Sequence, residues 1–415
     1  MTFFYNLFVH LFPILIRVAS IWNPKASLWV KGRKNQFERL RWAVGQDSKP
    51  IIWFHTASLG EFEQGRPVIE EVREQYPNYR ILLTFFSPSG YEIRKHYTGA
   101  DMVFYLPIDT KRSAKLFLDI TSPQIAIFIK YETWYNYLSI LKEKEVPSLL
   151  VSAVVYPQQF SFLPWANFMK RTLALFTHIF AQSDDALDML KANKINTEYS
   201  LCGDTRYDRV KTLSSAPFQN NGIERFLNNQ AVIVAGSTWH EDEKMLSMLQ
   251  NEQTRLKLII APHEIASKNI AAVKDLFEQS ILYSELEMIE NPEQYPVLII
   301  DNIGLLSKLY RYATIAYVGG GFNKAGIHNV IEAAVYGRVV LFGKNFSKSN
   351  EAKEMIEHSL GYAFSTKEEL ISIVDNLLGN SEHLNQKNQF AKEFVEERTG
   401  ATNKVLTLIK NHQLL

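Results

Sequence analysis

Two series of short apolar runs dominate the sequence, and nearly every run is followed by a stretch of helix-compatible residues. This alternation is typical of a parallel sheet whose strands are joined by crossover helices. A turn-rich segment, which contains SSAPFQNNG and NNQ, separates the two series. The sequence therefore predicts an α/β protein with two Rossmann-like domains. The runs are IIWFH, RILLTFF, MVFYLP, IAIFIKY, SLLVSAV and HIFAQS in the first series, and AVIVAGS, LKLIIAPH, YPVLIID, TIAYVGGG and RVVLFG in the second.

The length of 415 residues fits this division, because one hydrophobic core rarely serves so long a chain. A hydrophobic fraction of 46% argues against disorder. The only cysteine, Cys202, cannot form an intramolecular disulfide, which fits a reducing compartment. We expect a basic amphipathic segment over 1–50, a first domain over 51–210, a linker over 211–230, a second domain over 231–400 and a final helix over 401–415.

The N-terminal segment is the most basic part of the chain. Residues 1–50 hold eight Lys and Arg against two acids, a net charge of +6, whereas the remaining 37 basic and 42 acidic residues give −5. Its first twenty residues are apolar around one narrow polar stripe, and tryptophans and basic residues follow, a pattern typical of an interfacial anchor on anionic lipid. Two alternatives stay open: the segment packs against the protein body, or its helix spans a membrane. The stripe comprises Asn6, His10, Pro13, Arg17 and Ser20.

Two other interpretations of this segment are disfavoured. A signal peptide would have a lysine-rich start and a small-residue cleavage site, and neither is present. Nucleic acid is not expected as a partner, because no recognised binding motif accompanies the charge.

The segment IIWFHTASLGEFEQGRPVIE predicts a strand, a turn and a helix. Ser58 precedes Glu61 by three residues, the spacing of a capping box, and Gly60 leaves the first helical turn without a side chain. Glu61 is therefore either a helix cap or a catalytic carboxylate. Spacing alone favours the cap.

Functional groups in parallel sheets collect at the carboxyl ends of strands. After the second run, SPSG opens another helix and is either an anion cradle or an ordinary turn around Pro88. After the fourth run comes KYETWYN. The candidate binding residues of the first domain are Ser58, Gly60, Ser87, Ser89, Gly90, Lys130 and Glu132.

In the second domain, three glycines lie between a strand and a helix, where backbone amides could approach a phosphate. The spacing matches neither the dinucleotide fingerprint nor a P-loop. Further along, Asn329 and Glu332 are three residues apart on the first turns of that helix, as either a ribose-binding pair or an exposed capping pair. The candidate donor-binding residues are Ser237, Thr238, Pro262, His263, Gly304, Gly319, Gly320, Gly321, Asn329 and Glu332.

Six motifs in this order resemble the lipopolysaccharide Kdo (3-deoxy-D-manno-octulosonic acid) transferases, a family with the GT-B fold, in which two Rossmann-like domains face each other across a cleft. The resemblance covers nearly the whole chain. The motifs are HTASLGE, YLPIDT, the ETW-Y-N segment, AQS, GSTWHEDE and YVGGGFNKAGIHNVIEAA.

The resemblance implies an inverting transferase that moves Kdo from CMP-Kdo to the 6'-hydroxyl of a tetra-acylated lipid A precursor. It implies no metal ion and no cofactor, and a place at the cytoplasmic face of the bacterial inner membrane. Glu61 matches the family's proposed base and Glu132 its second acidic position. Pro262 and His263 match the donor loop, and the glycines with Asn329 and Glu332 match the cytidine monophosphate site.

Several positions depart from the family pattern. Pro-Arg-His is reduced to Pro262-His263, Gly-Glu-Leu reads Gly304-Leu305-Leu306, Asn-Ala-Arg reads Ser152-Ala153-Val154, and Lys130 replaces an acid. Two arginines are therefore missing, and Lys324, Lys130 or Arg206 are their candidate substitutes. The alternatives are another GT-B enzyme, such as a UDP-sugar transferase or UDP-N-acetylglucosamine epimerase, and a non-catalytic lipid-binding relative.

Overall fold

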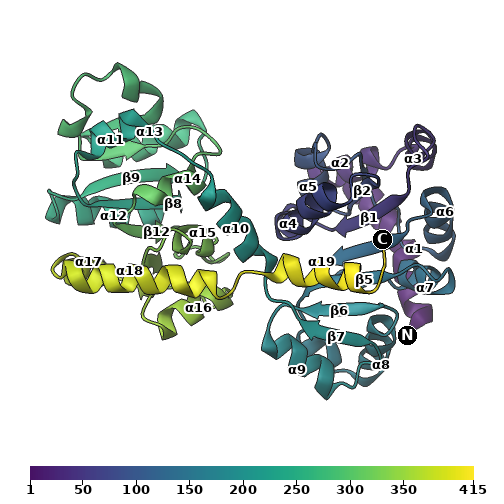
Figure 1. The fold of residues 1–415 in the computed structure, drawn as a ribbon. Coiled ribbons are helices and arrows are strands. Elements are labelled where there is room, and N and C mark those ends of the chain that lie inside the picture. Colours follow the sequence, from purple (N-terminus) through teal and green to yellow (C-terminus); the bar gives the residue numbers. More distant parts are fainter. The chain divides into compact units, whose positions relative to one another are not determined.

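The computed structural model describes residues 1–415 and divides them into two compact units (Figure 1). The first unit holds Met1–Arg209 and Thr399–Leu415, and the second holds Val210–Arg398. Each unit contains one seven-stranded sheet in which every strand pair is parallel. The predicted α/β class with two parallel-sheet domains is confirmed.

The first sheet has the strand order β3-β2-β1-β4-β5-β6-β7. Its inner strands are buried along their length, which explains why they are continuous apolar runs. The order reverses between β1 and β4, and ligands of such sheets bind outside the carboxyl ends of the strands at this point. The strands are β1 (Ile51–Thr56), β2 (Arg80–Phe85), β3 (Met102–Tyr105), β4 (Ile125–Ile129), β5 (Ser148–Ala153), β6 (His178–Ala181) and β7 (Glu198–Leu201).

The helices of the first unit supply the rest of its core. Phe117 of α6 packs its ring 4.9 Å from that of Trp53 on β1, centroid to centroid. The helices are α1 (Thr2–Ala19), α2 (Pro24–Gly32), α3 (Gln36–Val44), α4 (Leu59–Gln75), α5 (Pro88–Arg94), α6 (Lys111–Thr121), α7 (Tyr135–Glu143), α8 (Leu163–Leu173), α9 (Asp184–Ala192), α10 (Thr205–Ser215), which runs on into the second unit, and α19 (Ala401–Asn411).

The second sheet has the order β10-β11-β9-β8-β12-β13-β14, with its reversal between β8 and β12. Its strands are β8 (Val232–Thr238), β9 (Lys257–Pro262), β10 (Ser280–Leu282), β11 (Val297–Ile299), β12 (Ile315–Val318), β13 (Val340–Gly343) and β14 (Gly361–Phe364). Its helices are α11 (Asn221–Leu227), α12 (His240–Glu252), α13 (Ser267–Leu276), α14 (Leu306–Leu309), α15 (Ile331–Ala334), α16 (Asn350–Glu357), α17 (Lys367–Leu378) and α18 (Ser381–Glu396).

Three features differ from the sequence-based expectations. The segment 211–230 is largely helical, because it contains the end of α10 and all of α11. Strands β7, β10 and β14 were not anticipated, because they are short edge strands whose side chains are only partly buried and they lack a long apolar run. The helix expected to carry Asn329 begins two residues later and is only four residues long.

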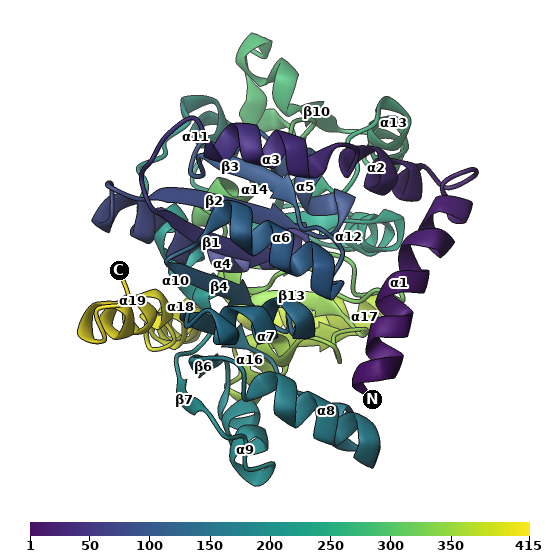
Figure 2. The same cartoon turned by 90° about the vertical axis from the view of Figure 1, so that its right-hand side faces the viewer.

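The N-terminal segment forms α1, α2 and α3, which belong to the first unit. Figure 2 shows α1 as a long helix at the edge of this unit, with the N-terminus at one end. One side of α1 is docked: the Tyr5 hydroxyl donates to Asp109 at 2.5 Å, and Asn136 of α7 donates to Asn6 at 3.0 Å. The opposite side of α1 is apolar and exposed, and comprises Phe3, Phe4, Leu7, Phe8, Leu11, Ile14, Leu15 and Val18.

Candidate functional site

Glu61 lies in the first turn of α4, just beyond the end of β1. Ser58 is the N-cap, and its hydroxyl oxygen accepts the Glu61 N–H at 3.5 Å. In return, one Glu61 oxygen accepts the Ala57 N–H at 2.6 Å and the other accepts the Ser58 hydroxyl at 3.2 Å. Glu61 therefore does cap its own helix, through the amide one residue before the cap.

The same carboxylate has unusual acid–base properties. Glu61 is only 5% exposed. Burial, followed by the nearby Glu132 carboxylate, raises the pKa of Glu61 to about 7, although the Ala57 and Ser58 hydrogen bonds and Lys130 act to lower it. A general base works best when its pKa lies near the working pH. Capping holds Glu61 in place, so its role as a helix cap is compatible with a role as a general base.

Glu132 belongs to a buried polar cluster that joins β1, β2 and the loop after β4. His55 is the register partner of Thr84 in the sheet, and its Nδ1 lies 2.9 Å from the Thr84 hydroxyl oxygen. The Nε2 of His55 lies 3.2 Å from Glu132 Oε2. Trp134 donates its indole N–H to the same Glu132 oxygen at 2.6 Å. His55 therefore contacts the second acidic residue directly.

No role was assigned from the sequence to His55, Thr84 or Trp134. His55 closes the first apolar run and Trp134 lies two residues after Glu132, so both positions carried a signal as strand-end neighbours. Thr84 carried none, because its contact depends on the register between β1 and β2.

The turn at Ser87 lies against the turn at Ser58. The Ser87 N–H and Phe86 N–H both donate to the Ala57 carbonyl, at 2.7 and 3.2 Å. A Cβ on Gly90 would collide with the Phe85 ring at 2.2 Å and would come within 3.1 Å of the Ser58 backbone, so the close packing here favours glycine. Ser87 caps α5 by accepting the Ser89 N–H at 3.2 Å. The structure thus brings the predicted residues after β1 and β2 together, and Ser87 and Ser89 have ordinary capping contacts.

Lys130 directly follows β4 and has a left-handed backbone, φ +74°. A non-glycine residue in this region is uncommon and costs on the order of 1 kcal/mol or more, and such positions cluster at functional sites. Its ammonium lies 5.3 Å from the centre of the Tyr131 ring and contributes to lowering the pKa of Glu61. Lys130 therefore belongs to the surroundings of Glu61.

In the second unit, three aromatic rings form a cluster at the carboxyl ends of the strands. His263 stacks on Trp239 at 4.7 Å and on His328 at 4.6 Å, with interplanar angles of 25° and 26°. The Trp239 indole donates to His328 Nε2 at 3.2 Å. Of these residues only His263 was predicted. The cluster lies beside Thr238 and Pro262, which line a cavity of about 310 Å³.

The glycine loop after β12 is tightly packed. A Cβ on Gly319 would collide with the backbone of Ser237, and one on Gly321 would collide with Gly343. The Gly319 N–H donates to Gly236 and the Gly320 N–H to buried Asp242, both at 2.9 Å. These glycines therefore permit close contact between strands, and two of the three amides already have internal acceptors.

The remaining predicted donor residues are placed as follows. Asn329 donates to Glu332 at 3.1 Å and accepts the Ile331 N–H at 3.1 Å, so it lies just before α15 and bonds to the first residue of that helix. Gly304 follows β11 with φ +91°, and a Cβ there would meet nothing within 4 Å. Ser237, at the end of β8, has φ +54°. All the predicted donor residues lie at or beyond the carboxyl ends of strands β8, β9, β11 and β12.

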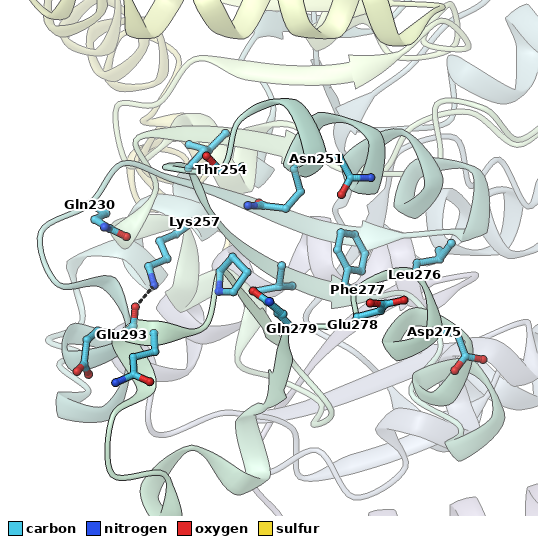
Figure 3. Close-up of a pocket in the computed structure, with 15 residues that line it drawn as sticks. Gln230, Asn251, Thr254, Lys257, Asp275, Leu276, Phe277, Glu278, Gln279 and Glu293 are labelled. Atoms are coloured by element: carbon cyan, nitrogen blue, oxygen red, sulfur yellow. Dashed lines mark hydrogen bonds between the residues drawn. The ribbon is translucent and has the colours of Figure 1, made fainter.

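A cavity of about 650 Å³ lies at the opposite edge of this sheet, near the first residues of β9 and β11 (Figure 3). Its one lysine, Lys257, donates to the carbonyls of Glu293 and Tyr295, both at 2.6 Å. None of the predicted donor residues lines it. In neither unit does a group of three or more His, Cys, Asp or Glu side chains come together in a way that could hold a metal ion.

Comparison with known proteins agrees with the motif pattern. The family model described as 3-deoxy-D-manno-octulosonic-acid transferase (kdotransferase) matches residues 34–209. A 3-deoxy-D-manno-octulosonic acid transferase of Rickettsia bellii is 26% identical over 89% of this chain and 90% of its own. The corresponding enzyme of Aquifex aeolicus is 29% identical over 83% of this chain and 91% of its own.

Among solved structures, UDP-GlcNAc 2-epimerase from Neisseria meningitidis bound to UDP-GlcNAc superposes with a TM-score of 0.61, covering 87% of this chain and all of that one. At 15% identity this likeness shows the fold alone. The parallel sheets, the ordered motifs and these relatives agree: the chain has the GT-B fold and is similar to the Kdo transferases over most of its length.

Proposed function

We propose that this enzyme transfers Kdo from CMP-Kdo to the 6'-hydroxyl of a tetra-acylated lipid A precursor, with inversion and without a metal ion or cofactor. The observation that carries the proposal is Glu61. It is a buried carboxylate, held by the α4 cap at the switch point between β1 and β4, and its pKa is about 7.

In this reaction the acceptor hydroxyl oxygen forms a bond to the anomeric carbon of Kdo. The bond from that carbon to the phosphate oxygen breaks, and its electron pair leaves with CMP. Glu61, as carboxylate, takes the hydroxyl proton, which makes the attacking oxygen a better nucleophile. Because the attack and the departure occur on opposite faces of the carbon, the configuration inverts.

We assign the acceptor to the first unit, around Ser58, Gly60, Ser87, Ser89, Gly90, Lys130 and Glu132. We assign CMP-Kdo to the carboxyl edge of the second sheet, where the aromatic cluster and the 310 Å³ cavity lie. Among the candidate replacements for the missing arginines, Arg206 already donates its Nε to the buried Asp204 at 2.8 Å. Lys324, which is exposed on the loop after β12 in the unit assigned to the donor, stays a candidate for binding the donor's negative charges.

The enzyme is proposed to act on the cytoplasmic face of the inner membrane through its N-terminal helix. By length and composition α1 could cross a membrane, a test that signal sequences and buried core helices also pass. On its docked side, however, Tyr5 and Asn6 form hydrogen bonds with Asp109 and Asn136. A helix with one side on protein and an apolar exposed side suits the lipid interface better than a span.

Incubation of the purified protein with CMP-Kdo and tetra-acylated lipid A precursor tests the proposal, with product mass as the readout. The expected result is a mass gain of one or more Kdo residues with CMP release. UDP-N-acetylglucosamine serves as the matched donor control and is expected to give no product. Absence of both CMP release and product would favour a non-catalytic relative, and turnover of the UDP-sugar would favour the epimerase-like alternative.

A further inference from the structure

Helix α1 is bonded to the part of the chain that positions Glu132. Glu132 lies in the loop after β4, residues 130–134, which we call the Glu132 loop. The Tyr5 hydroxyl of α1 donates to the Asp109 carboxylate at 2.5 Å, and Asp109 is fully buried. The same carboxylate accepts the backbone N–H groups of Asn136, at 3.0 Å, and Tyr137, at 2.9 Å. Both residues lie in the first turn of α7, so Asp109 joins α1 to the helix that directly follows the Glu132 loop.

Other contacts of the same stretch of α1 reach the start of α7. The side-chain amide of Asn136 donates to Asn6 at 3.0 Å, and the ring of Tyr5 packs 6.1 Å from that of Tyr135, centroid to centroid. Burial raises the pKa of Tyr5 above its usual value, and the Glu132 charge contributes to this shift. Tyr5 therefore lies within electrostatic reach of Glu132 itself.

A second path of contacts leads from the middle of α1 to the Glu132 loop. Phe12 follows Tyr5 by seven residues, which places both on the docked side of the helix. The Phe12 ring packs 5.8 Å from that of Phe86, and the Phe86 ring packs 4.8 Å from that of Trp134. The Trp134 indole in turn donates to Glu132 at 2.6 Å. Helix α1 thus supports both the Glu132 loop and the helix that follows it.

We propose that α1 is a functional part of the active site, in which Tyr5 is a positioning residue that holds the start of α7 through Asp109 and thereby keeps Glu132 beside Glu61. The Glu132 loop contains no helix or strand, so its conformation depends on such contacts. A buried carboxylate that loses one of its donors is costly, which makes the Tyr5 bond a strong constraint. The inference rests on the proposed function only for its catalytic consequence.

Hydrogen exchange of the intact protein, without substrates, tests the positioning directly. In Tyr5→Phe, peptides covering residues 130–137 are expected to exchange about fivefold faster, because one hydrogen bond that holds them is lost, while peptides from β1 keep their rate. Tyr97→Phe is the matched control: it removes a hydroxyl that lies 3.4 Å from Glu70 in the same unit and is expected to leave residues 130–137 unchanged.

Unchanged exchange of residues 130–137 in folded Tyr5→Phe would overturn the proposal, whatever reaction the enzyme catalyses. If Tyr5→Phe does not fold, Phe12→Leu carries the test, because Phe12 reaches the Glu132 loop through Phe86 and Trp134. Faster exchange at residues 130–134 is then the expected result, and unchanged exchange there would overturn the proposal in the same way.

The kinetics of transfer give a second readout, with the acceptor dispersed in detergent so that membrane binding is not required. Tyr5→Phe is expected to lower kcat about tenfold, because a misplaced group near the reacting atoms slows the chemistry, and to leave KM for CMP-Kdo unchanged, because we assign the donor to the second unit. Tyr97→Phe is expected to change neither. An unchanged kcat in Tyr5→Phe would show that α1 serves only as a membrane anchor. Where the wild type gives no transfer, the proposed function fails, and the exchange result still decides the role of Tyr5.

Discussion

Glu61 combines two roles that the sequence presents as alternatives. Its carboxylate completes the cap of α4 through Ala57 and Ser58, and the same contacts fix its orientation. Burial raises its pKa to about 7, which is the value a base needs at neutral pH. Such a carboxylate is destabilising at high pH, because the folded state resists its ionisation.

Replacing Glu61 with Gln should therefore change how stability depends on pH. The pKa is raised from 4.5 to about 7, so the folded state holds the proton more tightly and stability is lost as pH rises from about 4.5 to 7. Glu61→Gln removes this loss. We therefore expect the unfolding free energy of the variant minus that of the wild type to be larger at pH 8 than at pH 4.5, by on the order of 2 kcal/mol.

Denaturant unfolding at several pH values measures this difference. Asp109 also has its pKa raised to about 7 by burial, but it is present in both proteins and its contribution cancels. Equal pH dependence in the two proteins would mean that Glu61 titrates as an ordinary exposed carboxyl.

Gly60 offers a test of the acceptor-binding prediction. A Cβ at this position would meet nothing within 4 Å, and alanine stabilises a helix interior by up to about 1 kcal/mol relative to glycine. Gly60→Ala is therefore expected to raise the melting temperature slightly while raising KM for the acceptor, because the methyl group occupies space that we assign to substrate. An unchanged KM would remove Gly60 from the acceptor site.

Sequence reasoning reached Glu61 and Glu132 because both follow strands and belong to recognisable motifs. It did not reach the contact between His55 and Thr84, which requires the register of β1 against β2. It also placed Asn329 on a helix that begins only at Ile331. Phosphate binding by the glycines after β12 stays a prediction, and the structure adds that these glycines let neighbouring backbones approach closely.

At the scale of elements, α1 shows why periodicity gave an incomplete account. The polar stripe was expected to define one side of the helix, yet the docked side also buries Val9 and packs Phe12 against Trp29, at 5.8 Å between ring centres. The apolar surface of α1 therefore has two parts, one used by the protein and one exposed. Spacing cannot tell them apart, because both contain the same residue types.

The exposed side of α1 is expected to hold the enzyme on anionic vesicles. Replacing Leu11 and Leu15 with Asp places charges on this side and should abolish vesicle binding without affecting stability, since both residues are exposed. Met288→Asp, an exposed apolar position in the second unit, is the control. Flotation with phosphatidylglycerol-containing vesicles measures binding. Retained binding by the double variant would exclude the exposed side of α1 as the anchor.

At the scale of the whole molecule, the chain passes between the units twice. It leaves the first unit after Arg209 and returns at Thr399, and α19 completes the first core against α4. Asp208 accepts the backbone N–H groups of Gly400 and Thr402, at 2.5 and 2.7 Å, at the start of this helix. The final helix was predicted from its sequence, but its place in the first unit depends on contacts that spacing does not reveal.

The first unit should therefore depend on α19 for stability. Val405 is fully buried in the core shared with α4, whereas Lys410 on the same helix is exposed. Val405→Asp is expected to lower the melting transition of the first unit by several degrees or abolish it, because an unpaired charge would enter the core. Lys410→Asp is expected to leave it unchanged. Calorimetry measures both variants, and equal transitions would show that α19 contributes little.

The central claim is that Glu61 is the base for transfer of Kdo, and the transfer activity of Glu61→Gln tests it most directly. Wild type and variant are incubated with CMP-Kdo and lipid A precursor at pH 7.5, and the product mass is followed over time. We expect the wild type to form product and the variant to lose at least two orders of magnitude in rate while remaining folded. Near wild-type transfer by the folded variant would contradict this account and leave Glu61 as a helix cap alone.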